Sequence, residues 1–249
     1  MLVYTGATAL LLVLALKELP ALRRFIAPML GIGVTAAVSG IAFSLGVIEG
    51  EVARVLILFY LSPVWSVVLA RLVLREPLAA VTILAVALAM AGASMILLSG
   101  TGEALSGFGP ADLLGLLAGF AFALTNVQLR AARDLPARLK NLAASYLVPP
   151  LAASVALVAG VPMTASLPVV LSSLAIGALW MSTMIAAVQY GVSHLPLQRS
   201  SVLLLFELIV GALSAALIAG EALGSWELAG GACIVVAGLA VVWVRSRAD

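Results

Sequence analysis

Glu207 is the residue whose type and position most strongly suggest chemistry. It is an acidic residue well inside an apolar run, the segment 200–219. A carboxylate within hydrocarbon is costly unless it is neutral, paired or next to water, and such residues usually belong to solute or ion pathways. Helical spacing places Glu207, Gly211 and Ser214 on one face. Either this face lines a polar pathway, or a protonated Glu207 holds a neighbouring helix through a hydrogen bond.

A second group of candidates surrounds a proline in the apolar run 53–74. Pro63 removes one backbone hydrogen bond, which predicts a kink near the middle of a helix. Two residues flank the kink, and two more occupy the equivalent depth in the run 167–192. Rings with polar tips suit a cavity for amphipathic solutes. The predicted lining comprises Tyr60, Ser62, Trp65, Trp180 and Gln189, although each alone also fits ordinary packing or an interface anchor.

Asn126 is a further polar candidate, in the apolar run 112–129. It shares a helix face with Gly115, Gly119 and Phe122. Glycines four residues apart allow helices to approach closely. Asn126 therefore either ties two helices together or adds to the lining of a pathway.

The composition indicates an integral membrane protein. Of the 249 residues, 64% are apolar and 10% are charged, and the mean hydropathy is +1.24. A soluble core does not absorb so much apolar surface. His194 lies in a loop and Cys233 in an apolar run, so neither a metal site nor a disulfide framework is expected. We expect no cofactor and no nucleic-acid partner, and the absence of a basic segment before the first apolar run argues against a cleavable signal peptide.

Nine apolar segments follow one another along the chain. All are predicted to be helices, because lipid offers backbone polar groups no partner outside the segment. The segments are 2–16, 26–48, 53–74, 79–98, 112–129, 141–160, 167–192, 200–219 and 226–244.

The basic residues predict how these segments are oriented. If the loop 17–24 is cytoplasmic and the segments alternate, twelve of the 13 Lys and Arg residues fall on the cytoplasmic side and only Arg54 falls outside. Short cytoplasmic loops carry such an excess of positive charge. The N-terminus is therefore expected outside and the C-terminus in the cytoplasm, in a multi-pass inner membrane protein of bacterial type.

The chain also repeats itself at an offset of 145 residues. Arg54 and Glu76 are 22 residues apart, as are Arg199 and Glu221, and similar apolar sequences lie between them. The two Arg–Glu segments take opposite orientations, which predicts inverted repeats over 1–100 and 108–247. These four residues stand at helix starts, where the carboxylates offset the helix dipole. Their symmetry favours a structural role over contact with a solute.

The 145-residue offset matches four apolar segments of the first half with four of the second and leaves one segment without a partner. The segment 112–129 maps to positions before Met1, so we expect four helices in the first half and five in the second, out of a five-plus-five architecture. On this interpretation the chain starts one helix late. In-frame codons for an apolar stretch upstream of Met1 would support that expectation.

The order of these motifs resembles the EamA-type branch of the drug/metabolite transporter superfamily across essentially the whole chain. The resemblance rests on Phe59-Tyr60-Leu61-Ser62-Pro63-Val64-Trp65 leading to Arg75-Glu76-Pro77-Leu78, and on Leu205-Phe206-Glu207-Leu208 leading to Gly220-Glu221-Ala222-Leu223. The resemblance implies a ten-helix inner-membrane carrier with a central cavity between its halves. Two features depart from the family pattern: the first helix is absent, and Leu208 stands where many members have proline.

The resemblance implies a secondary transporter that moves a small organic metabolite, amino-acid-like, amphipathic or drug-like, by alternating access and in the direction of efflux. Its partners would be the lipid bilayer and the solute, with room for a homodimer. The alternatives are a membrane-embedded enzyme and a non-transporting truncated remnant. The enzyme would need a nucleophile–base pair or a metal set within the spans. No Walker loop is present, so nucleotide hydrolysis by this chain is not expected.

Overall fold

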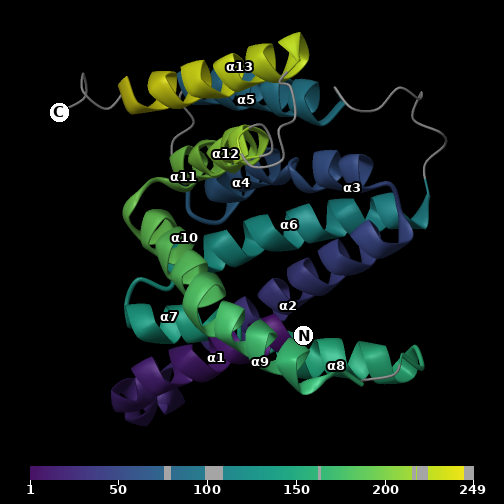
Figure 1. Ribbon diagram of the computed structural model, residues 1–249. Coiled ribbons are helices and arrows are strands. Elements are labelled where there is room, and N and C mark those ends of the chain that lie inside the picture. Colours follow the sequence, from purple (N-terminus) through teal and green to yellow (C-terminus); the bar gives the residue numbers. More distant parts are fainter. Residues whose placement is uncertain (76–79, 99–108, 162–163, 215–216, 218–223, 244–249) are drawn as a thin grey trace. The chain divides into compact units, whose positions relative to one another are not determined.

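The structure, a computed structural model, describes residues 1–75, 80–98, 109–161, 164–214, 217 and 224–243. Over these residues the regular structure is entirely helical (Figure 1). The chain divides into two compact units. The first unit comprises Met1–Ile41 and Leu124–His194, and the second comprises Ala42–Ala123 and Leu195–Asp249. Each unit thus combines segments from both halves of the sequence.

The first unit contains the amino-terminal helices and the middle of the chain. Its elements are α1 (Leu2–Ala15), the 3₁₀ segment η1 (Leu16–Phe25), the first part of α2 (Ile26–Glu49), the last part of α6 (Pro110–Ala131), α7 (Ala137–Ala143), α8 (Val148–Val158), α9 (Leu167–Ile176), the π-helical turn η2 (Gly177–Met181) and α10 (Ser182–His194). Helix α1 packs closely on η2. The approach is so close that a Cβ atom added at Gly177 would overlap the carbonyl oxygen of Val3.

The second unit contains two helix pairs and two longer single helices, together with parts of α2 and α6. Its other elements are α3 (Val52–Phe59), α4 (Ser62–Leu72), α5 (Ala80–Leu98), α11 (Leu197–Leu204), α12 (Phe206–Ser214) and α13 (Ser225–Trp243).

The helices fall where the apolar segments predicted them, but several segments are interrupted. The segments 26–48, 79–98, 112–129 and 226–244 each correspond to one helix. The segment 53–74 breaks before Pro63, and 141–160 breaks before Pro149 and Pro150, since proline lacks an N–H group and suits the first turn of a helix. The segment 200–219 breaks at Leu205, where the sequence contains no proline.

Five helical stretches are long and apolar enough to cross a membrane, judged by length and composition over the described residues. They are Leu2–Glu49, Arg54–Leu72, Pro110–Ala131, Ala137–Val158 and Leu167–His194. The first is 48 residues long and holds two of the predicted segments. The apolar parts of α5 and α13 are shorter, Ala80–Ile96 and Leu228–Ala240. The protein is thus a helical protein suited to a membrane, and the count of nine crossings stays a prediction.

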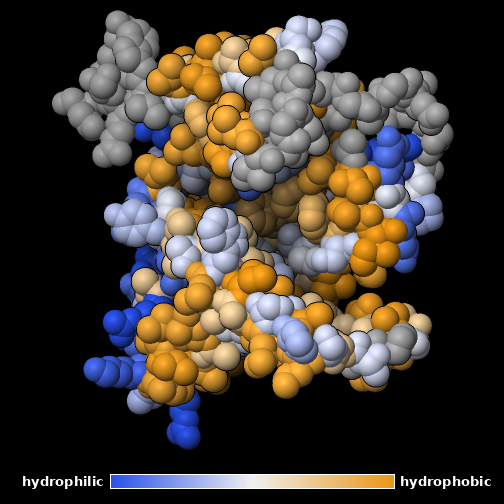
Figure 2. Space-filling model, viewed as in Figure 1, coloured by the Kyte–Doolittle hydropathy of each residue, from blue (hydrophilic) through white to orange (hydrophobic). Residues whose placement is uncertain are grey.

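The exposed apolar side chains are consistent with a lipid environment. Large apolar side chains are strongly exposed, among them Val158, Leu179 and Trp180. Figure 2 shows apolar side chains over much of the visible face, with strongly hydrophilic ones along its left edge and in a second group at its right. Contiguous exposed apolar surface is unfavourable in water and is what lipid chains require.

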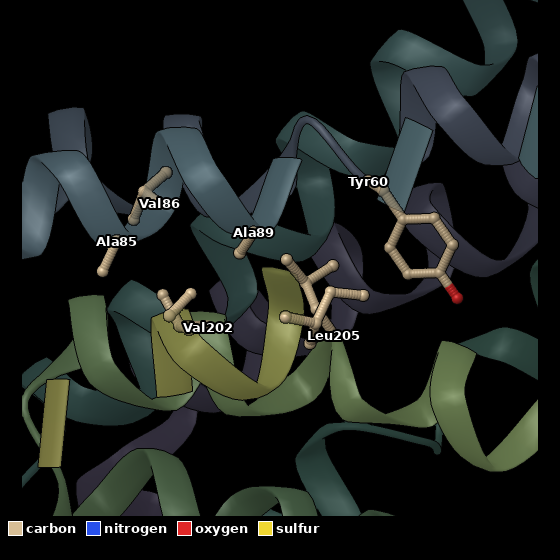
Figure 3. Packing of buried hydrophobic residues seen from close by; sticks show 8 residues of the cluster. Tyr60, Ala85, Val86, Ala89, Val202 and Leu205 are labelled. Carbon is tan, nitrogen blue, oxygen red and sulfur yellow. The ribbon is translucent and has the colours of Figure 1, made fainter. Parts of the chain in front are cut away.

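The core of the second unit lies between α5 and α13, which run antiparallel side by side (Figure 1). Gly92 and Gly230 meet where the two backbones are closest: a Cβ atom on either glycine would lie 2.5 Å from the carbonyl oxygen of the other. In Figure 3, Ala85 and Ala89 of α5 point toward Val202 and Leu205. Small side chains therefore set the close spacing of these helices.

Candidate functional site: a tyrosine–glutamate pair at two helix breaks

In the second unit, α3 is joined to α4 by one short turn, and α11 is joined to α12 by another. Between α3 and α4, the N–H of Leu61 donates to the carbonyl of Leu58 at 3.3 Å, and the N–H of Val64 donates to that of Leu61 at 2.9 Å. Between α11 and α12, the N–H of Leu205 donates to Val202 at 3.1 Å, and the N–H of Leu208 donates to Leu205 at 3.1 Å. These three-residue hydrogen bonds tighten the backbone locally and interrupt the α-helical pattern.

The two breaks occupy positions that the sequence repeat makes equivalent. Tyr60, which follows α3, and Leu205, which follows α11, are 145 residues apart. The offset read from the Arg–Glu motif thus recurs in the positions of the two breaks.

Tyr60 and Glu207 form a hydrogen bond at these breaks. The Tyr60 hydroxyl donates to Oε1 of Glu207 at 2.6 Å. A bond this short is typical of a hydroxyl donating to a carboxylate. Tyr60 is buried, whereas Glu207, in the first turn of α12, is exposed. Figure 3 shows the Tyr60 ring beside the apolar cluster, with its hydroxyl oxygen directed away from the labelled apolar side chains.

Two polar groups at or near this pair make no hydrogen bond within the described part of the chain. Among the described residues, the second carboxylate oxygen of Glu207 has no recorded partner. The indole Nε1 of Trp65 is buried and likewise has no hydrogen-bond partner in the described part of the chain. Buried polar atoms of folded proteins are nearly always hydrogen-bonded, so an unpaired donor needs an explanation.

Aromatic rings surround the tyrosine. Phe59 lies edge-on to Tyr60, with ring centroids 5.5 Å apart, and contacts Phe43 at 4.9 Å and Phe122 at 5.5 Å. Trp65, one turn beyond the break, meets Phe120 edge to face at 5.5 Å. The rings of Phe43, Phe59 and Phe122 therefore form one group with Tyr60, and Trp65 and Phe120 form a second ring contact.

The structure brings only part of the predicted lining together. Tyr60, Ser62, Trp65 and Glu207 belong to the second unit, with Ser62 buried at the start of α4. The remaining three belong to the first unit: Asn126 and Gln189 are buried, and Trp180 is 76% exposed on the π-helical turn.

The structure describes only part of the predicted helix face that Glu207 shares with Gly211 and Ser214 on α12. Ser214 donates to the carbonyl of Val210 at 2.7 Å, so its hydroxyl is used within its own helix. The surroundings of Gly211 lie outside what the structure describes.

The predicted repeat motif has a partner that the sequence did not suggest. Arg54 forms an ion pair with Oδ2 of Asp112 at 2.8 Å, and their side chains are 14% and 6% exposed. The same carboxylate oxygen accepts the N–H of Gly109 at 2.6 Å, at the start of α6. Arg199 is half-buried in α11. Glu76 and Glu221 lie outside the described residues. An acidic residue in the first turn of a helix was the available signal for Asp112.

Sequence analysis also missed a polar contact in the first unit, one residue away from Asn126. The Thr125 hydroxyl donates to that of Thr35 at 2.8 Å, and Nε2 of Gln128 donates to the Thr35 oxygen at 3.1 Å. Thr125 and Gln128 are three residues apart and so share a face of α6. That spacing was the signal that would have identified them.

Comparison with known proteins bears on the fold alone. No family model matches the chain, and no curated protein matches its sequence. Among solved structures 23 chains match. In one of them, a crystal structure of a protein, the alignment covers 98% of this chain and 86% of that one, with a TM-score of 0.76 and 16% sequence identity. At this identity the likeness is one of fold alone.

Proposed function

We propose that this chain is a secondary carrier that moves a small organic solute across the inner membrane by alternating access, with Tyr60 and Glu207 on the solute path. The observation that carries the proposal is their hydrogen bond at two helix breaks 145 residues apart. Carriers with repeated halves place their sites at discontinuous helices, where backbone and side-chain polar groups face a cavity.

The chemistry of the pair supports this role. A carboxylate in an otherwise apolar helix is tolerated when it is paired or meets water, and Glu207 is both hydrogen-bonded and exposed. Backbone that departs from the α-helix at membrane depth is tolerated where it is buried in protein or lines a water-filled cavity. A polar path at Tyr60 and Glu207 meets both conditions.

The site also favours a class of solute. Glu207 offers an acceptor and, when ionised, a negative charge, while Phe43, Phe59 and Phe122 offer aromatic surface. A protonated amine attached to an apolar body satisfies both, because cations bind carboxylates and ring faces. The indole N–H of Trp65 adds a donor for an acceptor group on the same solute. An amino-acid-like or amphipathic amine fits this combination.

The wider architecture follows from the same proposal. The equal offset of the two helix breaks, together with the antiparallel course of α5 and α13, supports two inverted halves. We infer nine crossings in the inner membrane, with the N-terminus outside and the C-terminus in the cytoplasm. The motif order supports membership of the EamA-type branch of the drug/metabolite transporter superfamily.

A transport assay with purified protein tests the proposal. The full chain, reconstituted in liposomes, is offered a panel of labelled amines, amino acids and neutral metabolites under an imposed pH gradient. Glu207→Gln keeps the shape of the side chain and removes its charge, so the initial rate for the best solute should fall about tenfold or more. Tyr60→Phe should give a smaller loss, because the carboxylate remains.

The matched control is Glu49→Gln, which makes the same change at an exposed residue in the last turn of α2. Its rate should equal that of the unaltered protein. The carrier proposal is wrong if the unaltered protein moves no member of the panel faster than empty liposomes. The assignment of Glu207 is wrong if the Glu207→Gln and Glu49→Gln variants transport equally well.

A further inference from the structure

The 3₁₀ segment η1, which joins α1 to α2 in the first unit, has a sequence that matches the period of its own helix. A 3₁₀ helix has three residues per turn, so side chains three positions apart lie above one another along its axis. Apolar side chains occupy one of the three ridges that this spacing creates: Leu16, Leu19, Leu22 and Phe25. The basic side chains of η1 fall on the other two ridges. The segment is therefore amphipathic in the conformation that it adopts.

The two polar ridges of η1 present a concentrated positive charge. Three basic side chains on them are exposed and have no ion-pair partner among the described residues: Lys17, Arg23 and Arg24. Arg24 lies 5.5 Å from the centre of the Phe25 ring, a contact that involves no carboxylate. The acidic residue of η1, Glu18, is more buried and lies 3.8 Å from Nη1 of Arg138 on α7. The exposed side of η1 is thus basic.

We propose that η1 lies along the membrane surface and that Lys17, Arg23 and Arg24 bind the headgroups of acidic phospholipids. A polar segment between two apolar helices belongs where the hydrocarbon layer ends. In that layer an amphipathic segment buries its apolar face at the acyl boundary and turns its basic face toward the headgroups. Basic residues beside a membrane-spanning helix attract anionic headgroups through their charge, which zwitterionic headgroups do not match. The proposal holds or fails independently of whether the chain moves a solute.

The test measures which lipids surround η1 in the full, folded chain. On a Cys233→Ala background, Ala21→Cys carries a fluorophore on the exposed side of η1. The protein is held in phosphatidylcholine nanodiscs with an equal small fraction of spin-labelled phosphatidylglycerol or spin-labelled phosphatidylcholine, and quenching reports the local concentration of each. Both faces of a nanodisc hold the same lipids, so the result does not depend on the orientation of the chain.

Phosphatidylglycerol should be preferred about fivefold at low ionic strength, which is the effect of one basic side chain per headgroup. The preference should shrink in concentrated sodium chloride, because salt screens exposed charges. Equal quenching by the two lipids at low ionic strength overturns the proposal.

Two variants and one control separate the basic face of η1 from the total charge of the protein. The preference should disappear in the triple variant Lys17→Gln, Arg23→Gln and Arg24→Gln, whose exposed positions leave the melting temperature in detergent unchanged. Replacing both arginines by lysine keeps the charge and should keep the preference. The matched control removes three exposed basic residues outside η1 and should also keep it: Arg71→Gln, Arg75→Gln and Arg133→Gln. The proposal is wrong if the η1 triple variant keeps the preference, if the lysine variant loses it, or if the control loses it as fully as the η1 triple variant does.

Discussion

At the scale of single residues, the hydrogen bond between Tyr60 and Glu207 joins two side chains separated by 147 positions. Each residue was recognisable from its sequence: an acidic residue within an apolar run and an aromatic residue beside a proline. Their pairing was not, because it depends on how α3 and α12 pack. The ion pair of Arg54 with Asp112 was not predicted for a similar reason. Asp112 lies at a loop boundary, where an exposed carboxylate is as common as an ion-paired one.

The Arg54–Asp112 ion pair gives a prediction about stability. Asp112→Asn removes the carboxylate and leaves a largely buried guanidinium beside an amide, which costs about 3 kcal/mol of unfolding free energy. The measurement is the midpoint of denaturant unfolding in detergent. Glu18→Gln is the control, because Glu18 lies 3.8 Å from Arg138, whose side chain is 56% exposed, and such pairs contribute about 1 kcal/mol or less. Equal losses in the two variants would contradict the buried role of Asp112.

At the scale of the elements, apolar run length predicted where helices occur, because within the described residues every apolar run is helical apart from short breaks. Breaks were less predictable. Pro63, Pro149 and Pro150 each mark one in the sequence. The break at Leu205 carries no such local mark, and it arises where Leu205 and Val202 pack into the core with α5 and α13. The opposed glycines Gly92 and Gly230 belong to the same packing and became recognisable as a pair only in the structure.

The contact between α5 and α13 predicts opposite effects for two adjacent glycines. Gly230→Ala places a methyl group 2.5 Å from the Gly92 carbonyl oxygen, so α5 and α13 must separate, and the unfolding free energy should fall by about 1–3 kcal/mol. Gly231→Ala meets nothing within 4 Å and should be neutral or stabilising by about 0.5–1 kcal/mol, since alanine favours the helix. Thermal unfolding of both variants in detergent checks this. The packing argument is refuted if Gly230→Ala is as stable as Gly231→Ala.

The turn between α11 and α12 predicts that proline is accepted at Leu208. This residue lies in the first turn of α12, where a lost N–H hydrogen bond to Leu205 and a fixed backbone angle are tolerated. Leu208→Pro should therefore cost about 1 kcal/mol or less. Leu203→Pro, within α11, should cost about 3 kcal/mol or more. Similar melting temperatures for the two variants would show that the helix does not break at Leu205.

At the scale of the whole molecule, composition and the distribution of basic residues predicted a helical membrane protein, and the apolar helices agree with that. The division into units did not follow from the sequence repeat, because each unit takes segments from both halves. Such mixing is a matter of tertiary packing, and a linear pattern of apolar runs contains no information about it.

The predicted orientation is checked by labelling single cysteines in intact cells. The background is Cys233→Ala, which removes the one native cysteine. A cysteine at Glu51 should react with a membrane-impermeant maleimide, and one at Arg133 should react only after the cells are opened. A C-terminal alkaline phosphatase fusion should be inactive. Labelling of the Arg133 position in intact cells would reverse the proposed orientation.

The unequal helix breaks have a consequence for the energetics of transport. Pro63 holds the turn after α3 in every conformation, because it has no N–H with which to restore the helix, whereas Leu208 keeps its N–H. In a carrier of two inverted halves, the inward-open and outward-open states would be degenerate only if the halves were equivalent. Here they are not, so under the proposed function the empty protein would favour one of the two states. In such a carrier the bias would change how fast each half-cycle runs without changing the gradient that the solute finally reaches.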